Sequence, residues 1–311
     1  MKINIITCIG SFGSLPYVSS IFKDILNKNV TISNKYEPDC LNILIDEAIT
    51  SAIYNRKADI YWVDTPIYTT KQLLQRYRLK QIENNLPNLY KKCYTTSQIN
   101  QEILRDLGFN VEDTIIPRPI NPEFFKHEVN YNNTDYDIIS IGYYDCYDRK
   151  NFRLQFKAIS QLKLNWCLIS NYKPPIKIYK QHYRFGSIND TTKIKLFTKS
   201  KFLLWTSFFE GFGMPVLEAM SVGCIPIYTD VPAHNEFAIG IKIPVLTKYK
   251  TYYYGFWAYK YKIDLNNIIQ SIEQALNLTK EEYQNLSEQC KEKALQIYNN
   301  FIDKLNLLLE V

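Results

Sequence analysis

Two glutamates, Glu210 and Glu218, have the residue type and spacing best suited to chemistry in this sequence of 311 residues. The apolar run at 201–206 that precedes them predicts a buried strand. Pro215 predicts the first residue of a helix, because its missing N–H would be unpaired at that position anyway. Glu210 then lies in the loop after the strand, and Glu218 lies about one turn into the helix. We expect both carboxylates to face the same mouth.

The loop between the two glutamates predicts a phosphate site. Gly211 and Gly213 allow the backbone to approach a ligand closely. The free N–H groups from Gly211 to Met214, at the start of the predicted helix, favour an anion. A phosphate site beside two carboxylates suits a sugar nucleotide, because the amides would bind the pyrophosphate and the carboxylates would bind hydroxyl groups.

The complete segment resembles the donor-binding signature of the GT-B glycosyltransferases, in particular the large retaining family 4. That signature reads E-G-F-G-x-P-x-x-E-A-M-x-x-G-x-P, and a match of this length is far more specific than a lone glycine loop. The chain matches every fixed position, with Glu210, Gly211, Phe212, Gly213, Pro215, Glu218, Ala219, Met220, Gly223 and Pro226. The resemblance implies an α/β fold with two Rossmann-like domains, whose parallel sheets face a cleft between the domains. It also implies that Glu210 binds the donor sugar and Glu218 the ribose, with Phe212 in the donor site.

The chain alternates predicted strands and helices from end to end, which is typical of α/β folds with parallel sheets. A cluster of prolines at 117–122 and the polar stretch at 128–133 indicate a boundary. We therefore predict a reduced amino-terminal, acceptor-side domain at 1–128 and a donor-binding domain at 129–311. The last helix, at 280–309, could pack back on the first domain. The other predicted elements are strands at 3–8, 59–63, 114–116, 137–142, 166–170 and 225–228, a short strand ending at 186, and helices at 16–26, 98–107, 152–162, 191–199 and 265–276.

A second resemblance to the same family concerns the cations that bind the donor phosphates. Relatives carry an arginine just after a glycine and a lysine several residues later. The glycine here is Gly142, and Tyr143 stands in the place of the arginine. Lys150 stands at the position of the family's lysine and by resemblance acts with Glu210 in catalysis. Arg149 could replace the missing cation, because arginine offers phosphate a bidentate fork; the alternative for both cations is a solvated turn before a helix.

Three further positions, Gly13, Asp64 and Ser187, are weaker candidates. By resemblance, the loop that contains Gly13 lies near the donor phosphates, and the glycine turn before Ser187 lies near the nucleotide base; a plain tight turn is the alternative for Gly13. Asp64 follows the apolar run at 59–63, and the first histidine of the chain is His127, whereas many relatives place a histidine of the first domain near the donor sugar. The Asp64 carboxylate could accept a proton from the acceptor, or it could merely cap the following turn.

The sequence contains no group of carboxylates and histidines with the spacing of metal ligands. Asp135 and Asp137 form a D-x-D pair, but they precede their apolar strand, whereas metal ligands at a cleft would follow it. We therefore predict no metal and no cofactor, with a nucleotide-diphosphate sugar, UDP- or GDP-linked, as the donor substrate. The resemblance implies transfer of a hexose with retention of the anomeric configuration. Without a metal, Lys150, Arg149 and the loop amides must stabilise the leaving diphosphate.

The acceptor is left open among a glycan, a lipid and a protein, because the first ninety residues resemble the family by pattern alone. An alternative of a different class is a non-catalytic GT-B-like module for sugar-nucleotide binding or for interaction, which the reduced first domain and the missing arginine favour. A third hypothesis is another GT-B enzyme, such as a phosphorylase or an epimerase. The aromatic cluster at 252–259 could stack on sugars, touch a membrane surface or belong to a core.

The composition is that of an ordinary folded protein, with 46% hydrophobic and 22% charged residues. A net charge of +6 is too small to indicate a nucleic-acid partner. Seven cysteines without a C-x-x-C pair favour reduced thiols, and no apolar run has the length of a transmembrane helix. We expect a cytoplasmic protein, either free or peripheral to a membrane; the sequence leaves the oligomeric state open.

Overall fold

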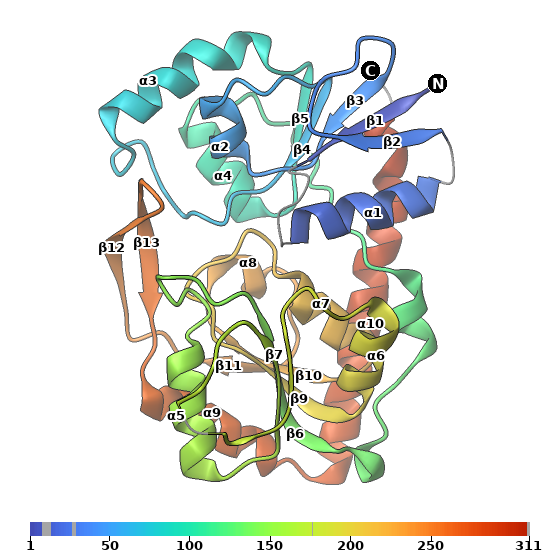
Figure 1. Ribbon diagram of the computed structural model, residues 1–311, viewed down its shortest axis with the longest axis vertical. Coiled ribbons are helices and arrows are strands. Elements are labelled where there is room, and N and C mark those ends of the chain that lie inside the picture. The colour runs from blue at the N-terminus through green and yellow to red at the C-terminus, as the bar shows by residue number, and fades with distance from the viewer. Residues whose placement is uncertain (8–13, 27–28, 176, 310–311) are drawn as a thin grey trace.

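The computed structural model describes residues 1–7, 14–26, 29–175 and 177–309 of the chain. Gly13, a predicted donor-site residue, lies outside this part. The described residues form two α/β units, one above the other, each built on a parallel sheet (Figure 1). This arrangement confirms the predicted α/β fold class with two parallel sheets.

The first unit is built on a five-stranded parallel sheet in the order β2-β1-β3-β4-β5. Its strands are largely apolar, and successive residues alternate between two buried faces. In β4, Ile60 and Trp62 belong to one buried cluster, whereas Tyr61 and Val63 belong to the other. The elements in chain order are β1 (Ile3–Ile6), α1 (Ser14–Leu26), β2 (Val30–Ser33), β3 (Leu41–Leu44), α2 (Ala48–Ile53), β4 (Ile60–Val63), α3 (Arg76–Asn85), a 3₁₀ turn (Leu86–Asn88), β5 (Lys92–Thr95) and α4 (Gln98–Asp106).

The second unit is built on a six-stranded parallel sheet in the order β11-β10-β9-β6-β7-β8. Two 3₁₀ turns, Pro122–Lys126 and Tyr131–Asn133, lead into it from the first unit. Its elements are β6 (Tyr136–Gly142), α5 (Phe152–Leu162), β7 (Trp166–Ser170), β8 (Tyr179–Tyr183), α6 (Asp190–Thr198), β9 (Ser200–Trp205), α7 (Met214–Ser221), β10 (Ile225–Thr229), α8 (Pro232–Asn235), β11 (Ile241–Ile243), β12 (Thr247–Tyr253), β13 (Phe256–Lys262), α9 (Leu265–Leu276), α10 (Lys280–Lys304) and a last 3₁₀ turn (Leu305–Leu308).

The strands β12 and β13 form a separate antiparallel hairpin that stands beside both units (Figure 1). It follows the second sheet in the chain but contacts the first unit. The backbone N–H of Tyr259 donates to the carbonyl of Tyr68 at 2.9 Å, and the Arg78 guanidinium lies 4.7 Å from the centre of the Phe256 ring. The aromatic cluster at 252–259 therefore belongs to a hairpin that bridges the two units.

The long helix α10 runs along the side of both units (Figure 1). It begins with the capping box of Thr279 and Glu282 that the sequence predicts. Near its end, the Phe301 ring stacks on Trp62 at 5.6 Å and meets Phe22 edge-on at 6.2 Å, both in the first unit. The last helix thus packs on the first sheet, while the boundary after residue 128 stays a prediction.

The sequence predicts the second unit more closely than the first. The bounds of α5, β7 and α9 agree with the prediction, whereas β2, β3, α2 and α3 were not predicted. The strand predicted at 114–116 is reduced to one bridge between Thr95 and Ile115, because Pro117 cannot donate a ladder hydrogen bond. The short strand predicted to end at residue 186 is β8, which ends earlier, at Tyr183.

Candidate functional site

Both sheets direct the carboxyl ends of their strands toward one cavity of ≈ 380 Å³. Glu47 and Asp64, which follow β3 and β4, line it from the first unit. Gly142 at the end of β6 and Glu210 after β9 line it from the second. Ligands of open α/β sheets bind at the carboxyl ends of strands, so this cavity is the candidate functional site.

The signature loop joins β9 to α7 on the second-unit side of the cavity. Gly213 ends the loop with a φ of +101°, and a Cβ there would lie 3.1 Å from His234 Nε2. A side chain at this position would therefore be strained and crowded. The helix begins at Met214, so Pro215 is its second residue and not the first, as predicted. Both residues line the cavity at the amino-terminal end of α7.

Gly211 brings the same loop against the first unit. A Cβ at Gly211 would lie 2.9 Å from Asp64 Cγ, closer than real contacts allow. The Asn100 side-chain amide also donates to the Gly211 carbonyl at 2.8 Å. Glycine is thus required where the loop touches the opposite wall.

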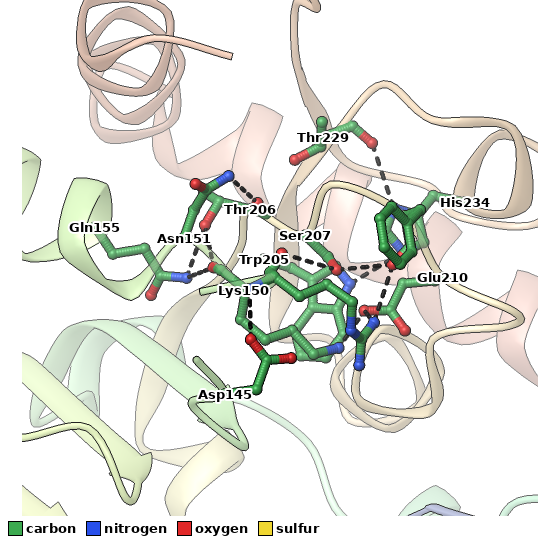
Figure 2. Close-up of polar contacts among 12 residues, drawn as sticks. Asp145, Lys150, Asn151, Gln155, Trp205, Thr206, Ser207, Glu210, Thr229 and His234 are labelled. Carbon is green, nitrogen blue, oxygen red and sulfur yellow. Dashed lines mark hydrogen bonds and ion pairs between the residues drawn. The ribbon is translucent and has the colours of Figure 1, made fainter. Parts of the chain in front are cut away.

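Glu210 lies at the centre of a buried charge cluster (Figure 2). Its carboxylate is 2.8 Å from Arg149 Nη1 and forms a second ion pair with Lys150 Nζ. Burial alone would raise the pKa of Glu210, but Arg149 and Lys150 lower it to about 2. Glu210 is therefore ionised at neutral pH, and two cations share its single charge.

Lys150 is the less firmly charged of the two cations. Burial and the neighbouring Arg149 lower the pKa of Lys150 to about 7, against the opposing effect of Glu210. Its Nζ also lies 3.8 Å from the centre of the Trp205 ring, a cation–π contact. An anion bound beside Lys150 would favour its charged form.

Backbone contacts hold the two cations next to the signature loop (Figure 2). The N–H of Phe208 donates to the carbonyl of Arg149 at 3.0 Å. The Thr206 hydroxyl donates to the carbonyl of Lys150 at 2.7 Å, and the Asn151 side-chain amide donates to the carbonyl of Thr206 at 2.8 Å. These bonds join two segments that are far apart in the sequence.

His234 packs against Gly213 of the signature loop and does not line the cavity among the described residues. Its Nε2 accepts a hydrogen bond from Trp205 Nε1 at 3.0 Å, and its Nδ1 lies 3.3 Å from the carbonyl of Thr229 (Figure 2). The proton therefore belongs on Nδ1. Burial lowers the pKa of His234 to about 4, so the ring is neutral. Its role is structural.

Glu218 does not share the mouth expected for it with Glu210. Among the described residues that line the cavity, Glu218 is absent. It lies on the buried side of α7, where Lys193 Nζ donates to its carboxylate at 2.7 Å. Lys193 also lies 3.2 Å from Asp190, which accepts from the Tyr17 hydroxyl of α1 at 3.0 Å. The expectation that Glu210 and Glu218 face the same opening is wrong, because Glu218 is buried and pairs with Lys193 of α6. The predicted contact between Glu218 and the ribose stays a prediction.

The remaining predicted residues divide between the cavity and its surroundings. Phe212 lines the cavity and stacks on Phe237 at 4.7 Å. Ser187 does not line it among the described residues; its hydroxyl donates to the Arg184 carbonyl within a turn. Phe185, two residues before Ser187, lines the cavity instead, and the centre of its ring lies 6.1 Å from that of the half-exposed Tyr143 ring.

Sequence reasoning missed several lining residues, notably Glu47, Arg118, Tyr253 and Tyr254. Glu47 follows an apolar run, which is the same signal that pointed to Asp64. The two tyrosines belong to an aromatic cluster whose role was left open. Arg118 carried no such signal, because it lies in a proline-rich segment between the predicted domains.

No three or more metal-ligating side chains come together within the described part of the chain. None of the described helices is both long and apolar enough to cross a membrane.

The two parallel sheets and the cavity between them define a fold of the GT-B class. A family model for glycosyl transferases group 1 matches residues 123–294, which is more than half of the chain. The chain therefore belongs to that family.

Comparisons with individual proteins agree with this assignment. ORF330 of Acidianus filamentous virus 2 (isolate Italy/Pozzuoli), provisionally named a glycosyltransferase, is 27% identical over 218 residues, covering 66% of this chain and 63% of that protein. The similarly named protein 41 of Sulfolobus islandicus filamentous virus (isolate Iceland/Hveragerdi) is 28% identical, covering 66% of this chain and 60% of that protein. The chain thus spans less than two thirds of the length of these two relatives. The crystal structure of Anabaena HepE in complex with UDP-glucose matches with a TM-score of 0.70 at 11% identity, covering 98% of this chain and 99% of HepE, a likeness of fold.

Proposed function

We propose that the chain is a retaining, metal-independent glycosyltransferase that moves a hexose from a nucleotide-diphosphate sugar to an acceptor hydroxyl. The observation that carries the proposal is the buried cluster of Glu210, Arg149 and Lys150 beside the start of α7. Family membership supports it, as do the names of the viral relatives. The UDP-glucose bound by HepE supports a uridine donor.

In this proposal the donor binds to the side of the cavity that the second unit forms, the second-unit wall. Lys150, Arg149 and the amides from Gly211 to Met214 bind the diphosphate, and Glu210 binds hydroxyls of the sugar. The rings of Tyr143 and Phe185, which line the cavity near the end of β6, are suited to stack on the base.

The reaction breaks the bond between the anomeric carbon and the phosphate oxygen and forms one to the acceptor oxygen on the same face. The acceptor proton goes to the leaving phosphate. Negative charge then grows on the diphosphate, beside Arg149, the protonated form of Lys150 and the start of α7. Each preorganised donor of this kind contributes about 2.7–4 kcal/mol to the transition state.

The test is incubation of the purified protein with UDP-, GDP- and ADP-linked sugars, with and without EDTA. Nucleotide release and binding heat are measured for the wild type and for Glu210→Ala. We expect release from one donor, unchanged by EDTA and lost in the variant. Release that EDTA abolishes would refute metal independence, and no binding of any donor would refute the donor site.

A non-catalytic sugar-nucleotide-binding module is the second candidate, favoured by Tyr143 in the place of the expected arginine. It predicts donor binding without release of nucleotide in the presence of any acceptor. The same experiment with an acceptor panel separates the two functions.

A further inference from the structure

Arg118 is a buried cation with an unused hydrogen-bond donor at the cavity. It is 1% exposed, and its guanidinium lies 4.9 Å from the centre of the Trp62 ring. Nη1 donates to the Trp62 carbonyl at 3.3 Å. Nη2 lies 3.5 Å from Asp64 Oδ2 but has no hydrogen-bond partner among the described residues. Since a buried donor without a partner is costly, this N–H is suited to a ligand in the cavity that Arg118 lines.

Asp64 holds an acceptor beside that donor. Asp64 directly follows β4, and its side chain, which lines the cavity, is 14% exposed. Its carboxyl group lies against the signature loop, because a Cβ at Gly211 would be 2.9 Å from Asp64 Cγ. Burial raises the pKa of Asp64, whereas the ion pair with Arg118 opposes this effect and favours the carboxylate form, which accepts hydrogen bonds. A group held by Asp64 would lie next to the proposed donor sugar.

The charges on this wall select a neutral ligand. Glu47, whose carboxylate accepts from the N–H of Ile49 at 3.1 Å, lines the same wall. Asp64 already balances the Arg118 guanidinium, and Glu47, whose pKa burial raises to about 7, adds partial negative charge, so the wall disfavours an anion. A neighbouring donor and acceptor match a hydroxyl group, which both donates and accepts.

We propose that Asp64 and Arg118 form a subsite for a neutral, hydroxyl-bearing acceptor of the sugar class. Asp64 accepts a hydrogen bond from the attacking hydroxyl, and Arg118 Nη2 donates to an adjacent oxygen of the same sugar. The inference rests on the proposed function. The pair positions the acceptor, and the acceptor proton still goes to the leaving phosphate.

The direct test measures binding of simple glycosides to the UDP-loaded protein by saturation-transfer NMR. The probes are the neutral methyl glucoside, mannoside and galactoside and the anionic methyl glucuronide. The proteins are the wild type, Asp64→Asn, Arg118→Gln and the matched control Asp303→Asn, an exposed residue of α10. We expect neutral glycosides to bind the wild type and the control, and to bind both subsite variants about tenfold or more weakly. UDP affinity should stay within about twofold in all four proteins.

Three results would overturn the subsite: glycoside binding unchanged in Asp64→Asn, preference for the glucuronide, or no neutral glycoside bound by the wild type. Thermal unfolding checks each variant. If Arg118→Gln unfolds, the nearly isosteric Asp64→Asn carries the test alone.

Turnover separates this inference from the proposed function. If Asp64→Asn raises the KM for the acceptor with little change in the KM for the donor, the subsite is supported. If the wild type releases no nucleotide but binds neutral glycosides through Asp64 and Arg118, the transferase proposal fails and the subsite stands.

Discussion

The two walls of the cavity are built in different ways. The second-unit wall comes from two segments, 142–151 and 206–214, which hydrogen bonds to backbone carbonyls tie together. Its central carboxylate, Glu210, is paired with two cations. The first-unit wall comes from residues of α1 and of separate loops, and Arg118 Nη2, although ion-paired with Asp64, has no hydrogen bond among the described residues. Two short segments can therefore preorganise one wall, whereas the other wall depends on residues scattered along the chain.

The two walls each carry both signs of charge, and they touch at the signature loop. The second-unit wall has Arg149 and Lys150 with Glu210 and Asp145, and the first-unit wall has Arg118 with Glu47 and Asp64. The Tyr68 hydroxyl donates to the carbonyl of Glu210, and Glu236 of the second unit accepts from the N–H of Ile99 at the start of α4 at 2.9 Å. Changes on the second-unit wall should therefore affect the donor first, and changes at these contacts should affect both walls.

The largest effect is expected for Lys150→Ala. Removal of one preorganised cation from the leaving diphosphate should lower kcat about 10²–10³-fold. Nucleotide release measures it, with Lys195→Ala, an exposed lysine of α6, as the control. A decrease in kcat of less than about threefold would show that Lys150 does not stabilise the leaving diphosphate.

The second largest effect is expected for Glu218→Gln, which changes the buried glutamate of the signature. The change leaves Lys193 buried with Asp190 as its remaining carboxylate partner among the described residues. We expect a loss of about 1–3 kcal/mol in the free energy of unfolding, measured by denaturant titration. Unchanged stability together with weaker UDP binding would instead indicate a role in ligand binding alone.

A pH dependence of UDP affinity follows from the lowered pKa of Lys150. In the free protein this pKa is about 7, and the diphosphate should raise it. Above pH 7 the free lysine is neutral and must take up a proton on binding, so affinity should fall by up to about tenfold per pH unit between pH 7 and 9. Calorimetry in buffers of different ionisation enthalpy measures the proton uptake. Lys150→Arg should abolish the dependence; a flat profile in the wild type would contradict it.

The smallest effect is expected for Tyr68→Phe at the contact between the walls. The change removes one buried hydrogen bond to the Glu210 carbonyl and should cost about 1 kcal/mol of stability. Because the loop would be less firmly held, the KM for the donor should rise about fivefold. Thermal unfolding and donor titration measure the two effects; a donor KM equal to that of the wild type would show that the contact only stabilises the fold.

The second unit could be predicted well because its elements are long and strongly patterned. The helix at 152–162 and the strand at 166–170 follow one another with clear apolar patterns, and the structure has the same bounds. The first unit has four-residue strands, too short to separate from loops by periodicity. The β12–β13 hairpin was missed for another reason, since an aromatic run is compatible with a core, a binding surface or a strand.

The sequence by itself determined the fold class, the family resemblance and the segment around Glu210, because these depend on residues close together in the chain. The tertiary structure decided which groups meet. It paired Glu210 with Lys150, turned Glu218 toward Lys193, and brought Arg118 against Asp64. Charge pairing depends on distance in space and on burial, and neither follows from the order of residues along the chain.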